Sequence, residues 1–230
     1  MPRSDLLERP RDGQAAAALP GVTVAAAADH DAARINCSVA KRALDIVGSA
    51  LALLVLSPLF LAIAIAIRID SPGPVFYRQP RNGRGGPFSI YKFRSMRSEP
   101  ADAEFRQASR DDARVTRIGR VLRRRNLDEL PQLLNVLRGE MSLVGPRPHP
   151  LALDQHFAPE IPNLMARYAV RPGMTGWAQV NGFRGETRES GQMAGRIEYD
   201  LAYLSDWSIR RDLTIILMTV SNPKAFENAF

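Results

Sequence analysis

The chain has 230 residues and a formal net charge of +7, from 31 lysines and arginines against 24 aspartates and glutamates. It is long enough for one sizeable domain and additional segments. Its charge favours an anionic partner such as phospholipid headgroups, nucleic acid or nucleotide-sugar phosphates. Cys37 is the only cysteine, which excludes an internal disulfide and a cysteine-rich zinc site. The three histidines lack metal-ligand spacing, and no Walker A or Gly-x-Gly-x-x-Gly sequence is present.

Residues 1–38 have the composition of a disordered tail. They contain two alanine runs and three prolines but no aromatic residue, so they can bury little apolar surface. They also lack the continuous apolar core, between a basic start and a cleavage site, that a secretory signal needs. Residues 221–230 are assigned to a second, C-terminal tail.

The next segment is long and apolar. Asp45 is the only charge within residues 43–67, and a helix of this length would extend about 37 Å, enough to cross the core of a bilayer. Ser57 and Pro58 lie in the middle, where a proline removes a backbone hydrogen bond and kinks a helix.

Basic residues flank this apolar segment at both ends, namely Lys41, Arg42 and Arg68. Because basic residues favour the cytoplasmic side of a membrane, the helix is predicted to enter and return to the same face. We therefore assign residues 39–70 to a re-entrant membrane helix broken at Ser57 and Pro58. A spanning helix with a proline kink is the alternative.

A β-hairpin is predicted after the membrane segment. A rigid Pro-Gly-Pro turn at 72–74 follows the helix, and residues 75–78 and 88–94 have strand composition on either side of a glycine-rich turn. Lys92 and Arg94, on the second strand, are candidate phosphate contacts. The alternative is a basic strand that faces solvent.

Six arginines crowd residues 114–125, where apolar residues give a short helical face. Nucleic acid, anionic lipid and substrate phosphate could each use these arginines. No aromatic residues are interleaved with them, and no helix-turn-helix or zinc-finger pattern is present, which argues against nucleic acid. Most of them are expected to form a solvated, lipid-facing stripe, with one or two binding substrate.

Residues 127–148 carry the most informative pattern. Pro131 fits only the first turn of a helix. Placing it at the third helical position makes Asp128 the N-cap and puts Glu129 in the electropositive first turn. Two adjacent carboxylates that follow an arginine run and precede a stiff Pro-Arg-Pro loop around Arg147 suit chemistry on a phosphorylated substrate. The alternative is a capped amphipathic helix without chemistry.

The remaining sequence completes the predicted fold. Residues 171–188, rich in glycine, arginine and threonine, form either a pocket-shaping loop or a plain surface loop. A helical stripe over 193–204 is expected to face the core, and a helix over 209–220 could lie on the membrane surface. The predicted fold class is α/β, mostly helical with a small β-hairpin. The re-entrant helix and amphipathic interfacial helices anchor it, and residues 71–220 form a cytoplasmic catalytic domain.

These motifs occur in one order, and together they closely resemble the bacterial sugar transferases, the monotopic polyprenyl-phosphate phosphoglycosyl transferases, over about residues 39–220. The motifs are Lys41-Arg42-x-x-Asp45, Ser57-Pro58, Ser71-Pro72-Gly73-Pro74-Val75-Phe76, Tyr91-Lys92-Phe93-Arg94-Ser95-Met96, Leu127-Asp128-Glu129-Leu130-Pro131-Gln132, Gly145-Pro146-Arg147-Pro148, Arg171-Pro172-Gly173-Met174-Thr175-Gly176-Trp177 and Asp206-Trp207-Ser208. The ordered set is highly specific, whereas no single motif is. Because only a short segment precedes residue 39, we expect no large N-terminal membrane domain of the kind that some members carry.

The resemblance implies that a UDP-sugar donates its sugar-1-phosphate to undecaprenyl phosphate, which starts exopolysaccharide, capsule or related glycan synthesis. It implies Asp128 as a nucleophile that forms a covalent phosphosugar intermediate, with Glu129 as its catalytic partner. Arg123 and Arg147 are the implied substrate-binding arginines. The resemblance also implies Mg²⁺, which Asp128 and Glu129 would hold together with substrate phosphates. The implied location is the cytoplasmic face of the bacterial inner membrane.

Glucose-1-phosphate is the expected transferred group, because the stretch that ends in Arg184-Gly185-Glu186-Thr187 most resembles glucose-1-phosphate transferring members. Galactose-1-phosphate is the alternative. An inactive membrane scaffold that recruits glycosyltransferases is the alternative of a different class, and the intact carboxylates and Arg147 oppose it. The expected partners are a UDP-sugar, undecaprenyl phosphate and anionic membrane lipids, with no nucleic acid. A homo-oligomer and downstream glycosyltransferases are further candidates.

Overall fold

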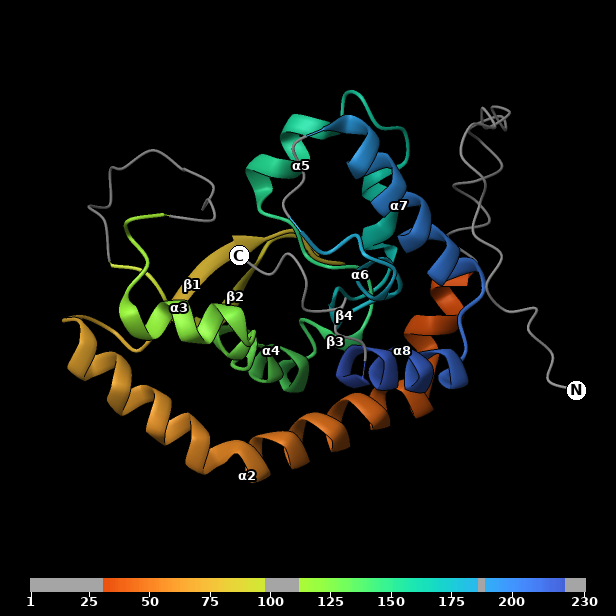
Figure 1. Ribbon diagram of the computed structural model, residues 1–230. Coiled ribbons are helices and arrows are strands. Elements are labelled where there is room, and N and C mark those ends of the chain that lie inside the picture. The colour runs from red at the N-terminus through yellow and green to blue at the C-terminus, as the bar shows by residue number, and fades with distance from the viewer. Residues whose placement is uncertain (1–30, 98–111, 186–188, 222–230) are drawn as a thin grey trace, which may run out of the picture.

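The computed structural model describes residues 31–97, 112–185 and 189–221 (Figure 1). In chain order its elements are α2 (Val39–Asp70), β1 (Phe76–Arg81), β2 (Phe88–Phe93), α3 (Arg117–Arg124), the 3-10 helix η1 (Leu127–Glu129), α4 (Gln132–Arg138), β3 (Ser142–Val144), α5 (Leu151–Phe157), the 3-10 helix η2 (Leu164–Ala169), β4 (Gly173–Thr175), α6 (Trp177–Val180), α7 (Ser190–Ser205) and α8 (Ile209–Ser221). The fold is mostly helical with a small antiparallel hairpin, as predicted. In Figure 1, α2 lies along one side, α3, α4 and α8 form a row against it, and the strands and α5–α7 lie beyond that row.

The predicted N-terminal tail divides at residue 31. Residues 1–30, like residues 222–230 of the predicted C-terminal tail, lie outside the described part of the chain. Residues 31–37, which the composition assigned to the tail, are helical, and Ala32 and Ile35 are buried in a core cluster with α7 and α8. Part of the predicted tail is therefore helical and packs against the core.

Helix α2 is one continuous, bent helix of 32 residues. It is long and apolar enough to cross a membrane, and only 11% of its most apolar window is buried within the protein. Pro58 cannot donate to the carbonyl of Leu54, its usual partner four residues earlier. The Ser57 hydroxyl donates to that carbonyl instead, at 2.8 Å. The predicted break at Ser57 and Pro58 is therefore a point inside a continuous helix where a side chain replaces a lost backbone bond.

The N-terminal arm of α2 is anchored by a buried ion pair. The Lys41 ammonium lies 2.7 Å from an oxygen of Asp212 on α8, and it also donates to the Val144 carbonyl at 3.0 Å. The Tyr203 hydroxyl and the Trp207 indole donate to the same Asp212 carboxylate. The basic residue and the Asp-Trp-Ser motif, far apart in sequence, thus belong to one network.

Two further charged residues fix this arm. Asp45 accepts hydrogen bonds of 2.9 Å from the Ser142 hydroxyl and from the Leu143 amide of β3. Arg42 donates to the carbonyls of Val136 and Leu137, both at 2.8 Å, near the C-terminal end of α4. The charges at the start of the apolar segment therefore bind internal partners, which explains their position at the edge of a helix that is otherwise apolar.

The C-terminal arm of α2 packs against the hairpin and α3. Ile63 and Ile67 form a buried cluster with Phe93 of β2 and Leu122 of α3. The arm ends at Asp70, whose carboxylate accepts from the Ile118 amide at 3.1 Å in the first turn of α3. An acidic side chain there satisfies an amide that has no partner within its own helix.

Within the described residues, four strands form two separate two-stranded sheets. The antiparallel pair β1–β2 confirms the predicted hairpin, with Phe76 opposite Phe93 and Arg81 opposite Phe88. The parallel pair β3–β4 was not predicted, because each strand has only three residues. At this crossing a Cβ on Gly173 would lie 2.1 Å from the Gly145 nitrogen, and a Cβ on Gly176 would lie 2.2 Å from the Gly145 carbonyl oxygen. The two backbones meet where no side chain has room.

The last two helices complete the core. Met193, Ile197 and Leu204 of α7 are buried, which confirms the predicted core stripe. Helix α8 buries Asp212 and Ile215 and leaves an apolar face exposed, formed by Leu213, Leu217 and Val220. Its proposed place on the membrane surface stays a prediction.

Asp212→Asn is expected to destabilise the protein by about 3–5 kcal/mol, because it removes the carboxylate that is in direct contact with the buried Lys41 ammonium. Thermal melting in detergent measures the effect. Asp206→Asn is the matched control, since it breaks an ion pair with Arg211 in which the Asp206 side chain is 87% exposed, and exposed pairs contribute little. Equal melting temperatures for the two variants would contradict the anchoring role of Asp212.

Candidate active site

The two adjacent carboxylates lie in a 3-10 turn, not at the start of an α-helix. Asn126 precedes the turn with a left-handed φ of 53°, and η1 covers Leu127–Glu129. Helix α4 begins only at Gln132, with Pro131 as its N-cap. The predicted N-cap role of Asp128 and the helical position of Pro131 are therefore wrong. Leu127 and Leu130 pack into the cluster between α2, β2 and α3, and this packing outweighs the local capping preference.

Glu129 is buried and binds three cations. Arg147 makes two contacts with its carboxylate, of 2.6 and 3.1 Å, in the paired geometry typical of guanidinium and carboxylate. The Lys92 ammonium lies at 2.8 Å and the Arg184 guanidinium at 3.2 Å. These cations come from β2, from the loop after β3 and from the segment after α6, so one carboxylate joins three distant parts of the chain.

Asp128 is as buried as Glu129, but its carboxylate has a different environment. Its relative exposure is 7%, yet within residues 31–97, 112–185 and 189–221 no group donates a hydrogen bond to its carboxylate. Lys92, Arg123 and Arg147 act on it through charge alone. Asp128 therefore keeps its oxygens available inside a strongly positive site.

The two carboxyl groups have opposite pKa shifts. Burial, together with the neighbouring charge of Glu129, raises the pKa of Asp128 above its ordinary value. Burial also disfavours ionisation of Glu129, but Arg147 and Lys92 outweigh it and hold the pKa of this carboxyl well below its usual range. Neighbouring carboxyl groups whose pKa values are driven apart are a common feature of catalytic pairs with divided roles.

Supporting contacts fix the cations around this pair. The Arg147 carbonyl accepts from Arg167 at 2.7 Å, and Arg167 also forms a buried ion pair with Asp200. Arg123 donates to the Ser95 hydroxyl at 3.0 Å and contacts the Met96 sulfur at 3.1 Å. Each of the two arginines is held from outside the carboxylate pair, so its position does not depend on the carboxylates alone.

The structure brings together most of the predicted site residues. Lys92, Arg123 and Arg147 surround Asp128 and Glu129. Arg94 does not join them in its contacts: its guanidinium donates to the carbonyls of Ser71 and Pro72, directly after α2. A substrate role for Arg94 stays a prediction, and in this structure the residue fixes the chain directly after α2.

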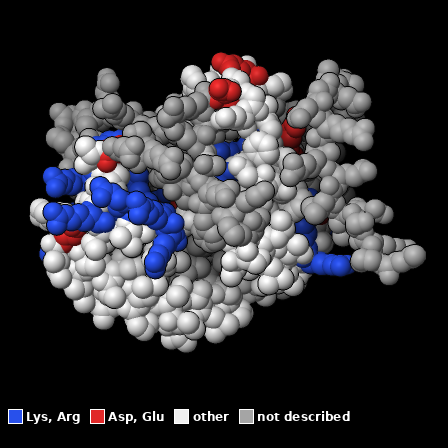
Figure 2. Space-filling view, viewed as in Figure 1, with Lys and Arg blue, Asp and Glu red and all other residues white. Residues whose placement is uncertain are grey.

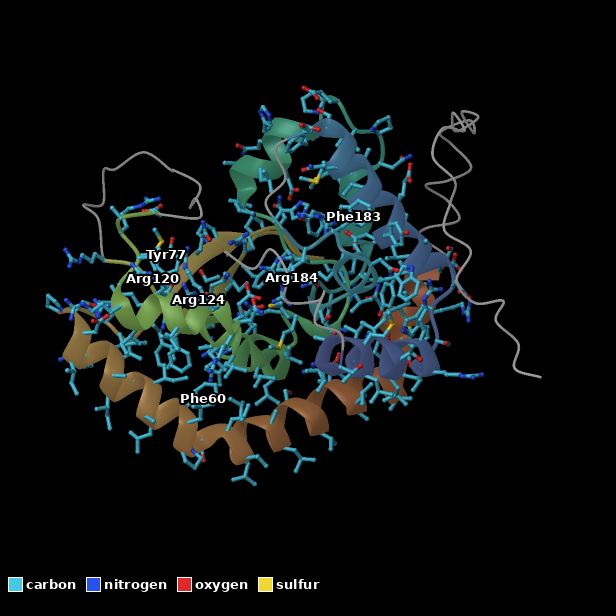
Figure 3. All side chains as sticks on the ribbon, viewed as in Figure 1. Phe60, Tyr77, Arg120, Arg124, Phe183 and Arg184 are labelled. Atoms are coloured by element: carbon cyan, nitrogen blue, oxygen red, sulfur yellow. The ribbon has the colours of Figure 1, made fainter. Side chains whose placement is uncertain are left out.

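Two site residues were not assigned from the sequence. Arg184 reaches Glu129 from 55 positions further along the chain. The sequence marked its segment as glycine- and arginine-rich and as similar to glucose-1-phosphate transferring members, but it assigned Arg184 no role. Arg81 of β1 donates to the Pro148 carbonyl beside Arg147. Burial, followed by repulsion from Arg147, lowers the pKa of Arg81 to about 10. Figure 3 shows Arg184 near the middle of the molecule, whereas Arg120 and Arg124 lie on α3.

The surface near the site is strongly basic. Figure 2 shows lysines and arginines gathered over α3, beside the uncharged face that α2 forms. Arg117, Arg120 and Arg124 are exposed there, and Phe76 and Tyr77 of the adjoining hairpin are 41% and 49% exposed. A basic band next to an apolar helix is the arrangement expected at the level of lipid headgroups.

Comparison with known proteins identifies the family. The model of the bacterial sugar transferase family matches residues 36–224, which is most of the chain. The chain belongs to this family.

Several similar proteins carry names that state their activity. A UDP-glucose:undecaprenyl-phosphate glucose-1-phosphate transferase of Caulobacter vibrioides is 50% identical over 198 residues, covering 86% of this chain and 74% of that protein. A transferase of the same name from Escherichia coli is 47% identical, covering 87% of this chain and 43% of that protein. A UDP-N-acetylgalactosamine-undecaprenyl-phosphate N-acetylgalactosaminephosphotransferase of Aeromonas hydrophila is 45% identical, covering 78% and 42%. The chain thus spans less than half of the last two relatives.

Arg147→Lys is expected to lower kcat/KM for the nucleotide sugar by about 10-fold or more, because an ammonium cannot reproduce the paired contacts of the guanidinium. Arg125→Lys is the control, since Arg125 is exposed. Activity is compared by release of the nucleotide, and folding by melting temperature. Near-normal activity of Arg147→Lys would remove Arg147 from the site, and a parallel loss of melting temperature would make its role structural.

Proposed function

We propose that this protein transfers glucose-1-phosphate from UDP-glucose to undecaprenyl phosphate. The observation that carries the proposal is the divided carboxylate pair: Glu129 binds cations from three segments, while Asp128 has no hydrogen-bond donor among the described residues. The names of the relatives in Caulobacter and Escherichia support the donor, the acceptor and the transferred group.

Asp128 is the proposed nucleophile. In the first step one of its oxygens attacks the β-phosphorus of UDP-glucose, the bond from that phosphorus to the bridging oxygen breaks, and UMP leaves with the bonding electron pair. In the second step an oxygen of undecaprenyl phosphate attacks the same phosphorus, and the Asp128 carboxylate leaves. Both nucleophiles are anionic, so Lys92 and Arg147 offset repulsion from the diphosphate and stabilise the charge of the transition state.

The residues of the site fit the Mg²⁺ ion that the family resemblance implies. Mg²⁺ is usually bound by one or two carboxylates together with substrate phosphates and water. Asp128 offers uncommitted oxygens of this kind, and Glu129 is adjacent. Within the described residues no larger cluster of acidic, histidine or cysteine side chains offers an alternative metal site. When bound, Mg²⁺ supplies charge neutralisation to the diphosphate.

We further propose that α2 is re-entrant and holds the site at the cytoplasmic face of the bacterial inner membrane. Both arms of the bent helix rise from its lowest part toward the rest of the protein (Figure 1). The exposed arginines of α3 would face anionic lipids at the same level. The phosphate of the lipid acceptor lies in this layer, so the second step takes place where that phosphate is found.

N-acetylgalactosamine-1-phosphate is a second candidate for the transferred group, because the name of the Aeromonas relative contains it. A panel of UDP-sugars separates the candidates, with UMP release as the measurement. UDP-glucose is expected to give the highest kcat/KM. A clear preference for another sugar would change the transferred group and leave the proposed reaction class in place.

Asp128→Asn is expected to abolish both UMP release and the covalent adduct, because an amide is a poor nucleophile. Intact-protein mass spectrometry after mixing with UDP-glucose, without the lipid acceptor, detects the adduct on the wild-type protein. Glu129→Gln is compared under the same conditions, and it is expected to lower the rate by disturbing the cations. An adduct trapped on any other residue would exclude Asp128 as nucleophile.

Labelling of cysteines tests the membrane topology. His30→Cys and Ala225→Cys are introduced separately into a Cys37→Ser background and treated with a membrane-impermeant reagent in intact cells. Both positions are expected to stay unlabelled until the cells are opened. Labelling of one position from outside would make α2 a spanning helix. Pro58→Leu restores the missing backbone donor and is expected to shift the helix toward spanning.

A further inference from the structure

The short segment that carries Arg184 is held by α7 through contacts that the two carboxylates do not explain. Arg196 donates to the Gly185 carbonyl at 2.6 Å. The Phe183 ring packs on the Tyr199 ring at a centroid distance of 5.1 Å. Residues 183 and 185 are thus both fixed by α7, and Arg184, between them, points to Glu129.

Two glycines shape the path of this segment and its packing. Gly182 has a φ of +96°, a conformation that side chains rarely adopt. A Cβ on Gly195 of α7 would lie 2.8 Å from the Phe183 ring. The ring therefore occupies the space above Gly195, and a larger residue there would force the Phe183 ring to shift.

Arg196 also braces the other arginine of the site. Its second terminal nitrogen lies 3.3 Å from the His149 ring, two residues after Arg147. Its side chain is buried, with a relative exposure of 6%. One guanidinium of α7 therefore contacts both segments that bring arginines to Glu129.

Cations outnumber carboxylates around Asp128 and Glu129. Lys92, Arg147 and Arg184 contact Glu129, and Arg123 acts on Asp128. Cations that converge on one site in this way can bind phosphate oxygens and stabilise their charge. A diphosphate that approaches Asp128 would meet Arg184 as one of these cations.

We propose that Arg184 is a further substrate-binding residue, which contacts the diphosphate of the nucleotide sugar, and that Arg196 is the positioning residue that presents it. This inference rests on the proposed function for the identity of the substrate. The Arg184 guanidinium would bind the phosphate oxygens through paired donors. Arg184 and Arg147 would thereby contact the same diphosphate from two different segments of the chain.

The test measures UDP binding and turnover separately. Arg184→Lys is compared with Arg84→Lys, a control in the exposed turn of the hairpin, by calorimetric UDP titration in Mg²⁺ buffer, by kcat/KM for UDP-glucose and by melting temperature. Arg184→Lys is expected to weaken UDP binding and to lower kcat/KM by about 10-fold or more with unchanged melting, whereas Arg84→Lys matches the wild type. Wild-type values of UDP binding and kcat/KM for Arg184→Lys would overturn the inference.

A change in stability and the role of Arg196 are tested separately. If Arg184→Lys melts early, UDP titration well below its melting temperature decides: weaker UDP binding supports the inference, and binding equal to that of the wild type overturns it. Arg196→Lys keeps a donor for the Gly185 carbonyl and is expected to retain part of the UDP affinity that Arg196→Met loses. Equal losses for both variants would reject the positioning role.

The measurement of UDP binding also distinguishes a failure of this inference from a failure of the proposed function. A wild-type protein that releases no UMP from any UDP-sugar would refute the proposed reaction, yet the comparison of UDP binding between Arg184→Lys and wild type would still decide the role of Arg184. Conversely, a wild-type protein that forms the Asp128 adduct, with Arg184→Lys equally active and equally able to bind UDP, would refute only the inference.

Discussion

The buried carboxylate of Glu129 is the point on which the arrangement of the site depends. A carboxylate in a poorly solvating interior must be neutralised, and here three cations from β2, the loop after β3 and the segment after α6 converge on it. None of these segments is adjacent to another in sequence. Their convergence leaves the neighbouring Asp128 in a field of positive charge without a hydrogen-bond donor from the described residues. The site thus combines a group that organises the cations with a group that is left free to react.

Helix α2 is part of the same arrangement. Its N-terminal arm holds the end of α4 through Arg42 and holds β3, which leads to Arg147, through Asp45. Its C-terminal arm caps α3, the helix that carries Arg123, through Asp70. A change in the bend of α2 would therefore move the segments that bear the site's cations relative to one another. The position of α2 and the geometry of the site are thus linked by direct contacts.

The sequence was most informative where a pattern is local or periodic. The apolar run, the hairpin and the core stripe of α7 follow from spacing alone, and the ordered motifs led to the carboxylate pair and to Arg147. The pairing of β3 with β4 did not follow, because three-residue strands carry no period. Arg184 was not assigned because its partner lies 55 positions away, and no local rule connects the two. The cap assigned to Asp128 failed for a related reason: the packing of Leu127 and Leu130, which is a tertiary effect, decides the turn.

The glycines where β3 meets β4 have a consequence for directed evolution of donor choice. Backbone atoms occupy the space that a Cβ on Gly145, Gly173 or Gly176 would need, so even alanine forces the two strands apart. Codon randomisation across this stretch would fill a library with misfolded clones. Residues 183 and 185 offer a narrower target, since both contact α7 and lie beyond the crossing. A library confined to these two positions, with Gly182, Arg184 and the three glycines of the crossing fixed, keeps the scaffold constant while it samples new nucleotide sugars.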